Sequence, residues 1–284
     1  MSILSIDGLN IRIKNKDVIA NGSLQIDAGD VLLLTGPNGS GKSTVIKTVM
    51  GDLFDYGSSI KVYASQFAFN DGTESYDLKG EEKNREVFRR RVCYVSQEDD
   101  FESESVLECF RMSLNYLPVD NPTKYVLDFI KRFSIYEGFG VDARLDLKSK
   151  KIIKNAGIKR NAINSEDIKA AKYLSMNTKR MSGGQKKLTN IFANMVKVEF
   201  CKLILLDEPL NNLDYNNVRA FSNALTKVHK AYPGIGIVMV THCRSIPIIN
   251  KVIEIDPKNG GFKIGKQYEC NSCFGDLNDS GLYI

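Results

Sequence analysis

Short apolar runs recur along the chain, and each is bounded by turn residues or charges. Uniformly apolar strands alternating with helices are typical of a parallel sheet covered on both faces. We predict five such strands, at residues 31–35, 92–95, 203–206, 237–240 and 252–255. The opening differs, because residues 3–6, Ile11 and Ile13 follow an alternating pattern. That pattern predicts a half-exposed antiparallel piece ahead of the main sheet.

Apolar residues spaced by three and four positions predict helices. The pattern gives four of them, at residues 43–50, 124–133, the stretch after Ser182, and 216–230. Gly51 follows the first helix and is a suitable C-terminal stop. The fold class is therefore α/β, with a mostly parallel sheet, an N-terminal antiparallel β subdomain and an inserted helical subdomain.

Composition sets few further limits. The 284 residues are 43% hydrophobic and 26% charged, which allows a buried core in an ordinary globular protein, and the net charge of +5 is only mildly basic. No stretch approaches the roughly 20 apolar residues of a membrane-spanning helix, and no secretory signal is evident. We therefore expect any work at a membrane to depend on a partner. Cys270 and Cys273 form a CxxC pair without further ligands nearby, which favours two thiols in a loop over a metal site.

A glycine-rich loop lies between the strand at 31–35 and the helix at 43–50. Its residues are Gly36, Pro37, Asn38, Gly39, Ser40, Gly41, Lys42, Ser43 and Thr44. They match the G-x-x-x-x-G-K-[ST] pattern, in which glycines let the backbone N–H groups surround phosphate oxygens. Lys42 would reach the β- and γ-phosphates, and the Ser43 hydroxyl would ligate Mg²⁺.

Two carboxylates end the strand at 203–206. Asp207 and Glu208 are placed at the carboxyl edge of the sheet, where ligands bind in open α/β folds. Asp207 would hold the Mg²⁺ shell, which leaves Glu208 to polarise water. Gln97 and His242 also follow strands, at 92–95 and 237–240, so they reach the same edge.

A second glycine pair follows Met181. Its residues are Ser182, Gly183, Gly184 and Gln185. Ser182 with Gln185 three residues later matches a capping box at a helix start. The two glycines have no side chains to cover the backbone N–H groups at the start of this helix. The helix start is therefore also a candidate anion site, with a γ-phosphate bound by another subunit as the candidate ligand.

Together these residues resemble the nucleotide-binding domain of the ABC ATPase family. Six segments occur in the family's order: a Walker A at 36–44, a Q-loop at Gln97, a signature at 181–185, a Walker B at 203–208, a D-loop at 212–214 and a switch histidine at His242. The resemblance implies a P-loop NTPase core. It also implies ATP and Mg²⁺ as ligands, with residues 1–256 as the ABC-type domain, 99–180 as its helical subdomain and 257–284 as a tail.

The family resemblance also assigns roles. It implies a head-to-tail dimer, with itself or a homologous subunit, in which the signature of one chain meets ATP on the Walker A of the other. Glu208 would be the general base, with His242, Gln97 and Lys42 as further catalytic groups. Mg²⁺ would be held by Ser43, Gln97 and Asp207, and Asp214 would communicate across the interface.

Two departures from the family pattern stand out. No aromatic residue or histidine precedes Gly36, so the usual adenine stack is missing; Arg12 or Lys14 could hold the base by cation–π contact. The stretch from Gln97 to the signature is long, which indicates an insertion within residues 117–178. The helical subdomain normally meets the partner, so its interface would be unusual.

Three functions are compatible with an ATP-hydrolysing domain of this kind. The leading one is the ATP-binding subunit that powers a separate membrane permease, cytoplasmic and peripheral on the cytoplasmic face. The alternative is a soluble ABC ATPase acting on a ribosome, RNA or another macromolecular complex, with the Lys/Arg-rich residues 144–160 as contacts. A charge run is more simply a solvated face, so nucleic acid is not expected. An assembly ATPase using the CxxC pair is the third.

Overall fold

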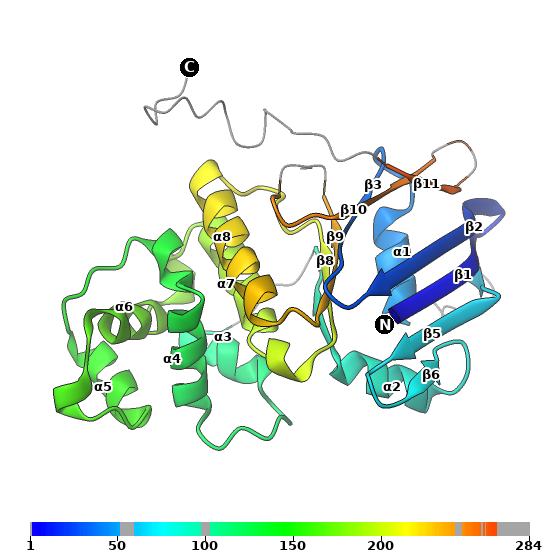
Figure 1. The fold of residues 1–284 in the computed structure, drawn as a ribbon. Helices are drawn as coiled ribbons and strands as arrows, with labels where there is room; N and C mark the ends of the chain where they lie inside the picture. Colours follow the sequence, from blue (N-terminus) through cyan, green and yellow to red (C-terminus); the bar gives the residue numbers. More distant parts are fainter. Residues whose placement is uncertain are drawn as a thin grey trace. The chain divides into compact units, whose positions relative to one another are not determined.

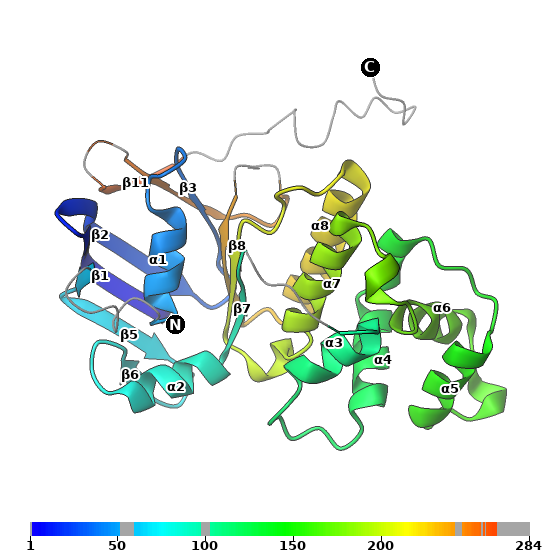
Figure 2. The same ribbon diagram turned by 180° about the vertical axis from the view of Figure 1, so that it is seen from behind.

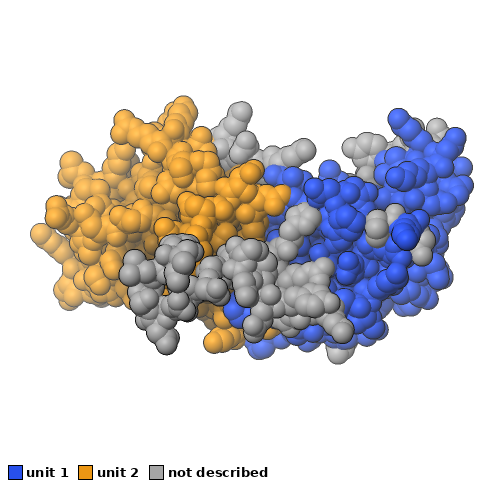
Figure 3. Space-filling model, turned by 90° about the horizontal axis from the view of Figure 1, so that it is seen from above, with its two compact units in different colours: residues 1–97, 200–209, 232–284 blue, residues 98–199, 210–231 orange. Residues whose placement is uncertain are grey.

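The computed structural model describes residues 2–51, 60–97, 103–241, 246–256, 258 and 260–265. These residues form two compact units, drawn in different colours in Figure 3. Unit 1 contains residues 1–97, 200–209 and 232–284, and unit 2 contains residues 98–199 and 210–231. Within the described ranges, no helix has the length and apolar character needed to cross a membrane.

The main sheet of unit 1 has the strand order β11-β10-β3-β9-β8-β7 (Figures 1 and 2). Its strands are β3 (Val31–Thr35), β7 (Val92–Val95), β8 (Leu203–Asp207), β9 (Gly236–Val240), β10 (Lys251–Ile255) and β11 (Phe262–Ile264). All neighbours are parallel except β10 and β11. Every residue of β3, β8 and β9 is buried, as their uniformly apolar sequences predict.

A second sheet is antiparallel and carries the N-terminus. Its strands are β1 (Ser2–Ile13), β2 (Lys16–Asp27), β4 (Ile60–Tyr63), β5 (Gln66–Asn70) and β6 (Ser75–Asp77). The strand order is β2-β1-β5-β6, with β4 also paired to β1. Helix α1 (Lys42–Val49) lies between the two sheets (Figure 1), and its apolar side chains join one core with residues of both. Helix α2 (Glu82–Arg90) completes this unit.

Unit 2 is helical. Its α-helices are α3 (Val106–Ser113), α4 (Pro122–Arg132), α5 (Leu147–Asn155), α6 (Ser165–Leu174), α7 (Gly183–Met195) and α8 (Tyr215–Ala231). Short 3-10 turns occur in it at Ile135–Phe139, Arg160–Ala162 and Thr178–Arg180, and a further one, Val198–Phe200, ends on the first residue of the next segment of unit 1. Helices α4, α5 and α6 lie within residues 117–178, where the sequence predicts an insertion, and they pack against one another.

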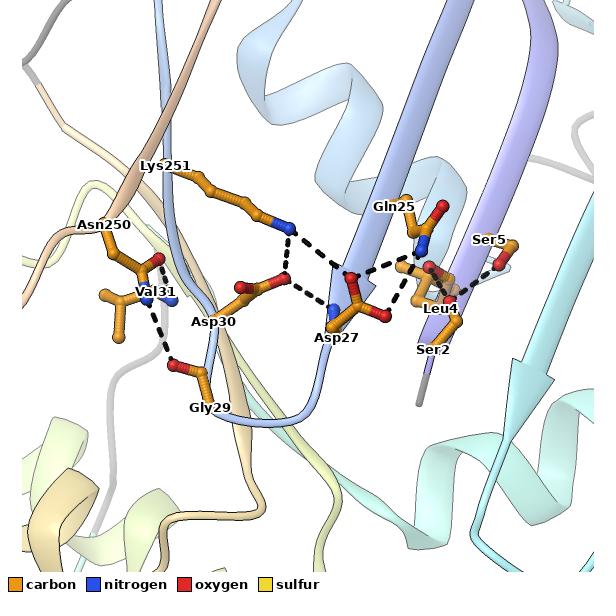
Figure 4. Close-up of polar contacts among 10 residues, drawn as sticks. All are labelled: Ser2, Leu4, Ser5, Gln25, Asp27, Gly29, Asp30, Val31, Asn250 and Lys251. Atoms are coloured by element: carbon orange, nitrogen blue, oxygen red, sulfur yellow. Dashed lines mark hydrogen bonds and ion pairs between the residues drawn. The ribbon is translucent and has the colours of Figure 1, made fainter.

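A polar cluster joins the segments that lead into β3 and β10, at the N-terminal ends of these two strands (Figure 4). Lys251 at the start of β10 donates to Asp30, at 2.6 Å, and its ammonium lies 3.5 Å from Asp27. Asn250 accepts from the N–H of Val31 at 2.9 Å. These contacts tie the start of β10 to the start of β3, and so align the two strands whose far ends flank the glycine-rich loop.

The predicted strands and helices are confirmed with shifts of one or two residues at their ends. The predicted half-exposed antiparallel opening is also confirmed. One element was not predicted: β11 lies within residues 257–284, for which we predict a tail without naming a strand. Its three residues pair with β10, and the ring of Phe262 packs against Gly22 of β2.

Candidate functional site: a phosphate-binding loop and two carboxylates

The glycine-rich loop leaves β3 at Thr35 and enters α1 at Lys42. Gly36, Gly39 and Gly41 have positive φ angles of 151°, 76° and 98°. A side chain at Gly36 would lie 2.8 Å from the Ser40 hydroxyl, and one at Gly41 would lie 2.7 Å from a methyl of Val18. Glycine is therefore required at both positions by conformation and by space.

Lys42 is the first residue of α1, and only 4% of it is exposed. Its ammonium group donates to the carbonyl oxygens of Gly36 and Pro37, both at 3.0 Å. Burial lowers the pKa of Lys42, while the charges of Glu208 and Asp207 act in the opposite direction. A cation is thus held inside the loop, aimed at the place where the motif would cradle phosphates.

Ser43 and Asp207 meet although 164 positions separate them in the sequence. The Ser43 hydroxyl donates to Oδ1 of Asp207 at 2.9 Å. The other oxygen, Oδ2, is buried without a hydrogen-bond partner, and so is the Ser40 hydroxyl. Such orphaned polar atoms mark a place where a ligand belongs. A hydroxyl beside a carboxylate oxygen is a donor set that suits a hard divalent cation.

Burial raises the pKa of Asp207, and the nearby charge of Glu208 acts in the same direction, whereas the Ser43 hydrogen bond opposes the shift. The site thus disfavours a bare carboxylate at this position. A bound cation would remove that penalty.

Glu208 follows β8 in a left-handed conformation, with φ of 50°. Its N–H donates to the carbonyl oxygen of Val240 at 2.9 Å, which fixes the turn after the strand. A non-glycine residue held with positive φ stores backbone strain of the kind that gathers at functional sites. Because Glu208 directly follows Asp207, a second acidic residue lies at the same end of β8.

Gln97 is exposed and follows β7, whose last residue pairs with Leu206 of β8. Its strand therefore ends beside the strand that carries Asp207. His242 lies outside the described residues, as do Cys270 and Cys273. Among the predicted catalytic and metal-binding residues, the structure brings together Lys42, Ser43, Asp207 and Glu208.

The second glycine pair is in unit 2, at the start of α7. Ser182 accepts from the N–H of Gln185, and Gln185 accepts from the N–H of Ser182, both at 3.2 Å. The predicted capping box is therefore confirmed. Ser182 and Gly183 are exposed, and nothing lies within 4 Å of where a Gly183 side chain would be.

Asp214 is also in unit 2 and caps α8. It accepts from the backbone N–H of Asn217 at 2.8 Å and from the side-chain amide of Asn217 at 3.0 Å. That amide lies 2.7 Å from where a side chain at Gly184 would begin. Lys187 donates to the carbonyl oxygen of Asn211 at 2.9 Å. Two contacts therefore join the signature helix to the segment around Asp214.

Sequence reasoning missed Asn217 and Val18. Asn217 is 4% exposed and touches both Asp214 and Gly184, but a single buried Asn within a helix carries no motif signal. Val18 is recognisable only from its contact with Gly41. Arg12, the predicted adenine contact, pairs with Asp17 across the β1–β2 hairpin, at 2.6 Å and 2.8 Å.

A parallel sheet, a phosphate-binding loop and two carboxylates at the end of β8 define the class of P-loop nucleotide-binding proteins. A family model described as ABC transporter matches residues 19–211, which is more than half of the 284 residues. The chain belongs to the ABC transporter family, as an ATP-binding domain. It is thus an ATP-hydrolysing subunit of the kind that powers a membrane permease.

Relatives with described roles agree with this placement. A probable ABC transporter ATP-binding protein of Streptococcus pyogenes is 26% identical over 242 residues, covering 85% of this chain and 79% of that protein. The manganese transport system ATP-binding protein MntB of Listeria monocytogenes is 25% identical over 239 residues, covering 84% and 80%. The zinc uptake system ATP-binding protein ZurA of Listeria innocua is 25% identical over 240 residues, covering 84% and 76%.

Solved structures show the same fold. The protein cbiO1 of Clostridium perfringens, part of the ABC transporter complex cbiONQ, is similar with a TM-score of 0.63 and 21% identity, covering 93% of this chain and 87% of that chain. The ATP-binding subunit of another ABC transporter has a TM-score of 0.59 and 17% identity, covering 95% and 91%.

Proposed function

We propose that this chain hydrolyses MgATP in a head-to-tail dimer, with itself or a homologous subunit, on the cytoplasmic face of a membrane where it powers a separate permease. One observation carries the site assignment. The Ser43–Asp207 hydrogen bond leaves Oδ2 of Asp207 buried and unpartnered beside a phosphate-binding loop. A metal–phosphate ligand would satisfy both features at once.

Each residue then has a chemical task. Lys42 would exchange its bonds to the loop carbonyls for bonds to the β- and γ-phosphates. Ser43 and Asp207, with Gln97, would hold Mg²⁺, which neutralises charge that develops on the transferring phosphoryl group. Glu208 would accept the proton of the attacking water. His242 would contact the γ-phosphate, as the family resemblance implies.

The arrangement of the signature favours a dimer. Ser182 and Gly183 expose the N-terminal end of a 13-residue helix, and the first turn of that helix holds no acidic residue. Such an end favours an anion. A γ-phosphate held by the Walker A of a second chain is the ligand that would complete both half-sites. Asp214, joined to Gly184 through Asn217, would carry the state of one site to the other.

Mixing two variants tests the dimer. Lys42→Ala removes the phosphate-binding cation, and Ser182→Arg blocks the signature, so each homodimer should be inactive. In a head-to-tail mixed dimer, one site contains both defects and the other contains neither. Equimolar mixing should restore ATP hydrolysis to a substantial fraction of the parent rate. A mixture that stays as inactive as either variant alone would contradict composite sites.

The permease assignment needs a different experiment. Glu208→Gln should bind MgATP and hardly hydrolyse it, so the head-to-tail dimer should stay ATP-bound and engaged with its partner. Tagged Glu208→Gln would be isolated from its native cell in MgATP and detergent. Lys42→Ala is the control, because without the phosphate-binding cation it should not form the ATP-bound dimer. Recovery of a polytopic membrane protein with Glu208→Gln supports the proposal. Recovery of ribosomes or RNA without a membrane protein supports the soluble alternative instead, and the relatives named above favour the former.

A further inference from the structure

Residues 144–160 contain an unusual concentration of charge. Seven basic side chains and one carboxylate give this segment a net charge of +6, whereas the whole chain has +5. The rest of the molecule is therefore close to neutral, and its basic character comes from this one segment. The single carboxylate, Asp146, is already used as the N-cap of α5.

Helix α5 divides this segment into an inner and an outer face. Ser149, Ile152, Ile153 and Ala156 are buried, and α5 contacts α4 and α6. At about 100° per residue, these four positions span about 100° of the helix, and the exposed positions span about 160° on the other side. The exposed positions are Leu147, Lys148, Lys150, Lys151, Lys154 and Asn155.

The lysines of this outer face are not neutralised within the protein. Among the described residues, none of Lys148, Lys150, Lys151 and Lys154 forms an ion pair. The neighbouring carboxylate of Asp142 is engaged by Lys172 and lies 3.8 Å from Arg144. Four cationic groups thus remain available to an external anionic partner.

An exposed leucine lies at the centre of the same face. Leu147 is 84% exposed, and Lys151 and Lys154 follow it at helical spacings of four and seven. Leu145, just before the helix, is 36% exposed. The basic face of α5, defined as Leu145, Leu147, Lys148, Lys150, Lys151 and Lys154, therefore presents aliphatic side chains surrounded by ammonium groups.

We propose that the basic face of α5 docks onto an anionic phospholipid surface. The lysine ammonium groups would lie among the headgroup phosphates, and Leu147 would enter the boundary with the acyl chains. This contact adds a direct lipid interaction to the attachment through a permease, and it does not depend on ATP hydrolysis. It would orient α5, with α4 and α6 packed against it, toward the bilayer.

The side chains favour lipid over RNA. Single-stranded nucleic acid is bound by stacking bases on aromatic rings along a basic groove. No aromatic residue occurs between 144 and 160. An exposed leucine gains nothing from a phosphodiester backbone, but it gains free energy when it enters the acyl region.

Vesicle sedimentation with the purified full chain, without a permease, tests the proposal. The parent should bind vesicles that contain roughly one-third phosphatidylglycerol in phosphatidylcholine, and not vesicles of phosphatidylcholine alone. Lys150→Gln/Lys154→Gln should weaken binding roughly 30-fold, because each cation near an anionic bilayer strengthens binding about fivefold and the two factors multiply. Leu147→Ser should weaken it roughly tenfold.

Lys83→Gln/Lys230→Gln is the matched control, since it removes the same charge from exposed lysines outside this face. It should retain at least most of the parent's vesicle binding, and ATP hydrolysis should be unchanged in all three variants. Equal loss in the control would reduce the effect to net charge and overturn the proposal. Failure of the parent to bind anionic vesicles, or binding of single-stranded RNA that Leu147→Ser leaves intact, would also overturn it.

Discussion

The Ser43 hydroxyl donates a 2.9 Å hydrogen bond to Oδ1 of Asp207, which joins the start of α1 to the end of β8. The two elements are far apart in sequence, and β3 and β8 are separated in the sheet by β9. The bond therefore holds two oxygen donors in place before any ligand binds. Pre-positioning of this kind lowers the cost of organising the site during nucleotide binding.

Asp207→Asn should stabilise the protein without nucleotide and abolish MgATP hydrolysis. The pKa of Asp207 is raised in the folded state, so folding holds this proton more tightly than the unfolded chain does. The parent therefore loses stability as pH rises above the ordinary carboxyl value of 3.8 and through the raised folded pKa. At neutral pH the variant should melt about 2–4 °C higher, which corresponds to about 1 kcal/mol.

The same pair of proteins supplies the control for that prediction. Below the ordinary carboxyl pKa, both proteins carry a neutral group at position 207, so their melting temperatures should converge. Adding MgATP should raise the melting temperature of the parent much more than that of Asp207→Asn, because bound ligand stabilises only the state that binds it. An Asp207→Asn variant that melts lower than the parent at neutral pH would contradict the burial penalty.

Glu208→Gly should separate backbone strain from chemistry. Glu208 has a φ of 50°, a conformation that glycine adopts without steric cost. The strain released, of order 1–3 kcal/mol, is partly offset by the extra entropy of glycine in the unfolded chain. Denaturant unfolding should show a gain of up to about 1 kcal/mol, while turnover falls at least about 100-fold through loss of the base. Glu208→Ala is the matched control, since it removes the carboxylate but keeps the strain.

Gly184→Ala should impair hydrolysis by displacing Asn217. The added methyl would lie 2.7 Å from the Asn217 amide, and that amide donates to Asp214. Gly183→Ala is the steric control, because its added methyl meets nothing within 4 Å. ATP binding by single chains should be retained in both variants, and steady-state hydrolysis should fall roughly tenfold further in Gly184→Ala than in Gly183→Ala.

A double-mutant cycle with Asn217→Ala tests the cause of that loss. Removing the amide makes room for the methyl, while Asp214 can still cap the helix by accepting from the backbone N–H of residue 217. Gly184→Ala/Asn217→Ala should therefore be more active than the product of the single effects predicts. Strictly additive effects would show that Gly184 acts on the phosphate alone and not through the segment around Asp214.

The parts of this protein that depend on short segments could be predicted from sequence. Apolar strands and amphipathic helices follow from local periodicity, and the loop at 36–44 places glycines where positive φ is required. The capping box at Ser182 can likewise be predicted from sequence, because its two partners, Ser182 and Gln185, are three residues apart.

Features created by contacts between distant segments could not be predicted. The orphaned Oδ2 of Asp207 exists because β8 ends against α1, and Val18 matters because β2 passes the loop at Gly41. The strand β11 is only three residues long, too short for a periodicity signal, and depends on pairing with β10. Asn217 acquires its role from packing between two helices. Sequence alone specifies the residue types here, but not which of them meet.

The adenine contact stays a prediction, and the structure sharpens it. Arg12 is paired with Asp17, which raises the pKa of the guanidinium through that hydrogen bond and keeps the group on the β1–β2 hairpin. A planar guanidinium fixed in this way can still offer its face to a purine ring, and an exposed contact of that kind contributes about 0.5–1 kcal/mol.

Arg12→Ala/Lys14→Ala should therefore weaken ATP binding about two- to fivefold, with less effect on a nucleotide whose base is a pyrimidine. Equilibrium titration with ATP and CTP measures this, and Asp17→Asn, which keeps the guanidinium but loosens it, should give a smaller loss. Tight, adenine-selective binding that survives in the double variant would exclude both cations and direct attention to Val18, the side chain that already lies against Gly41 of the loop.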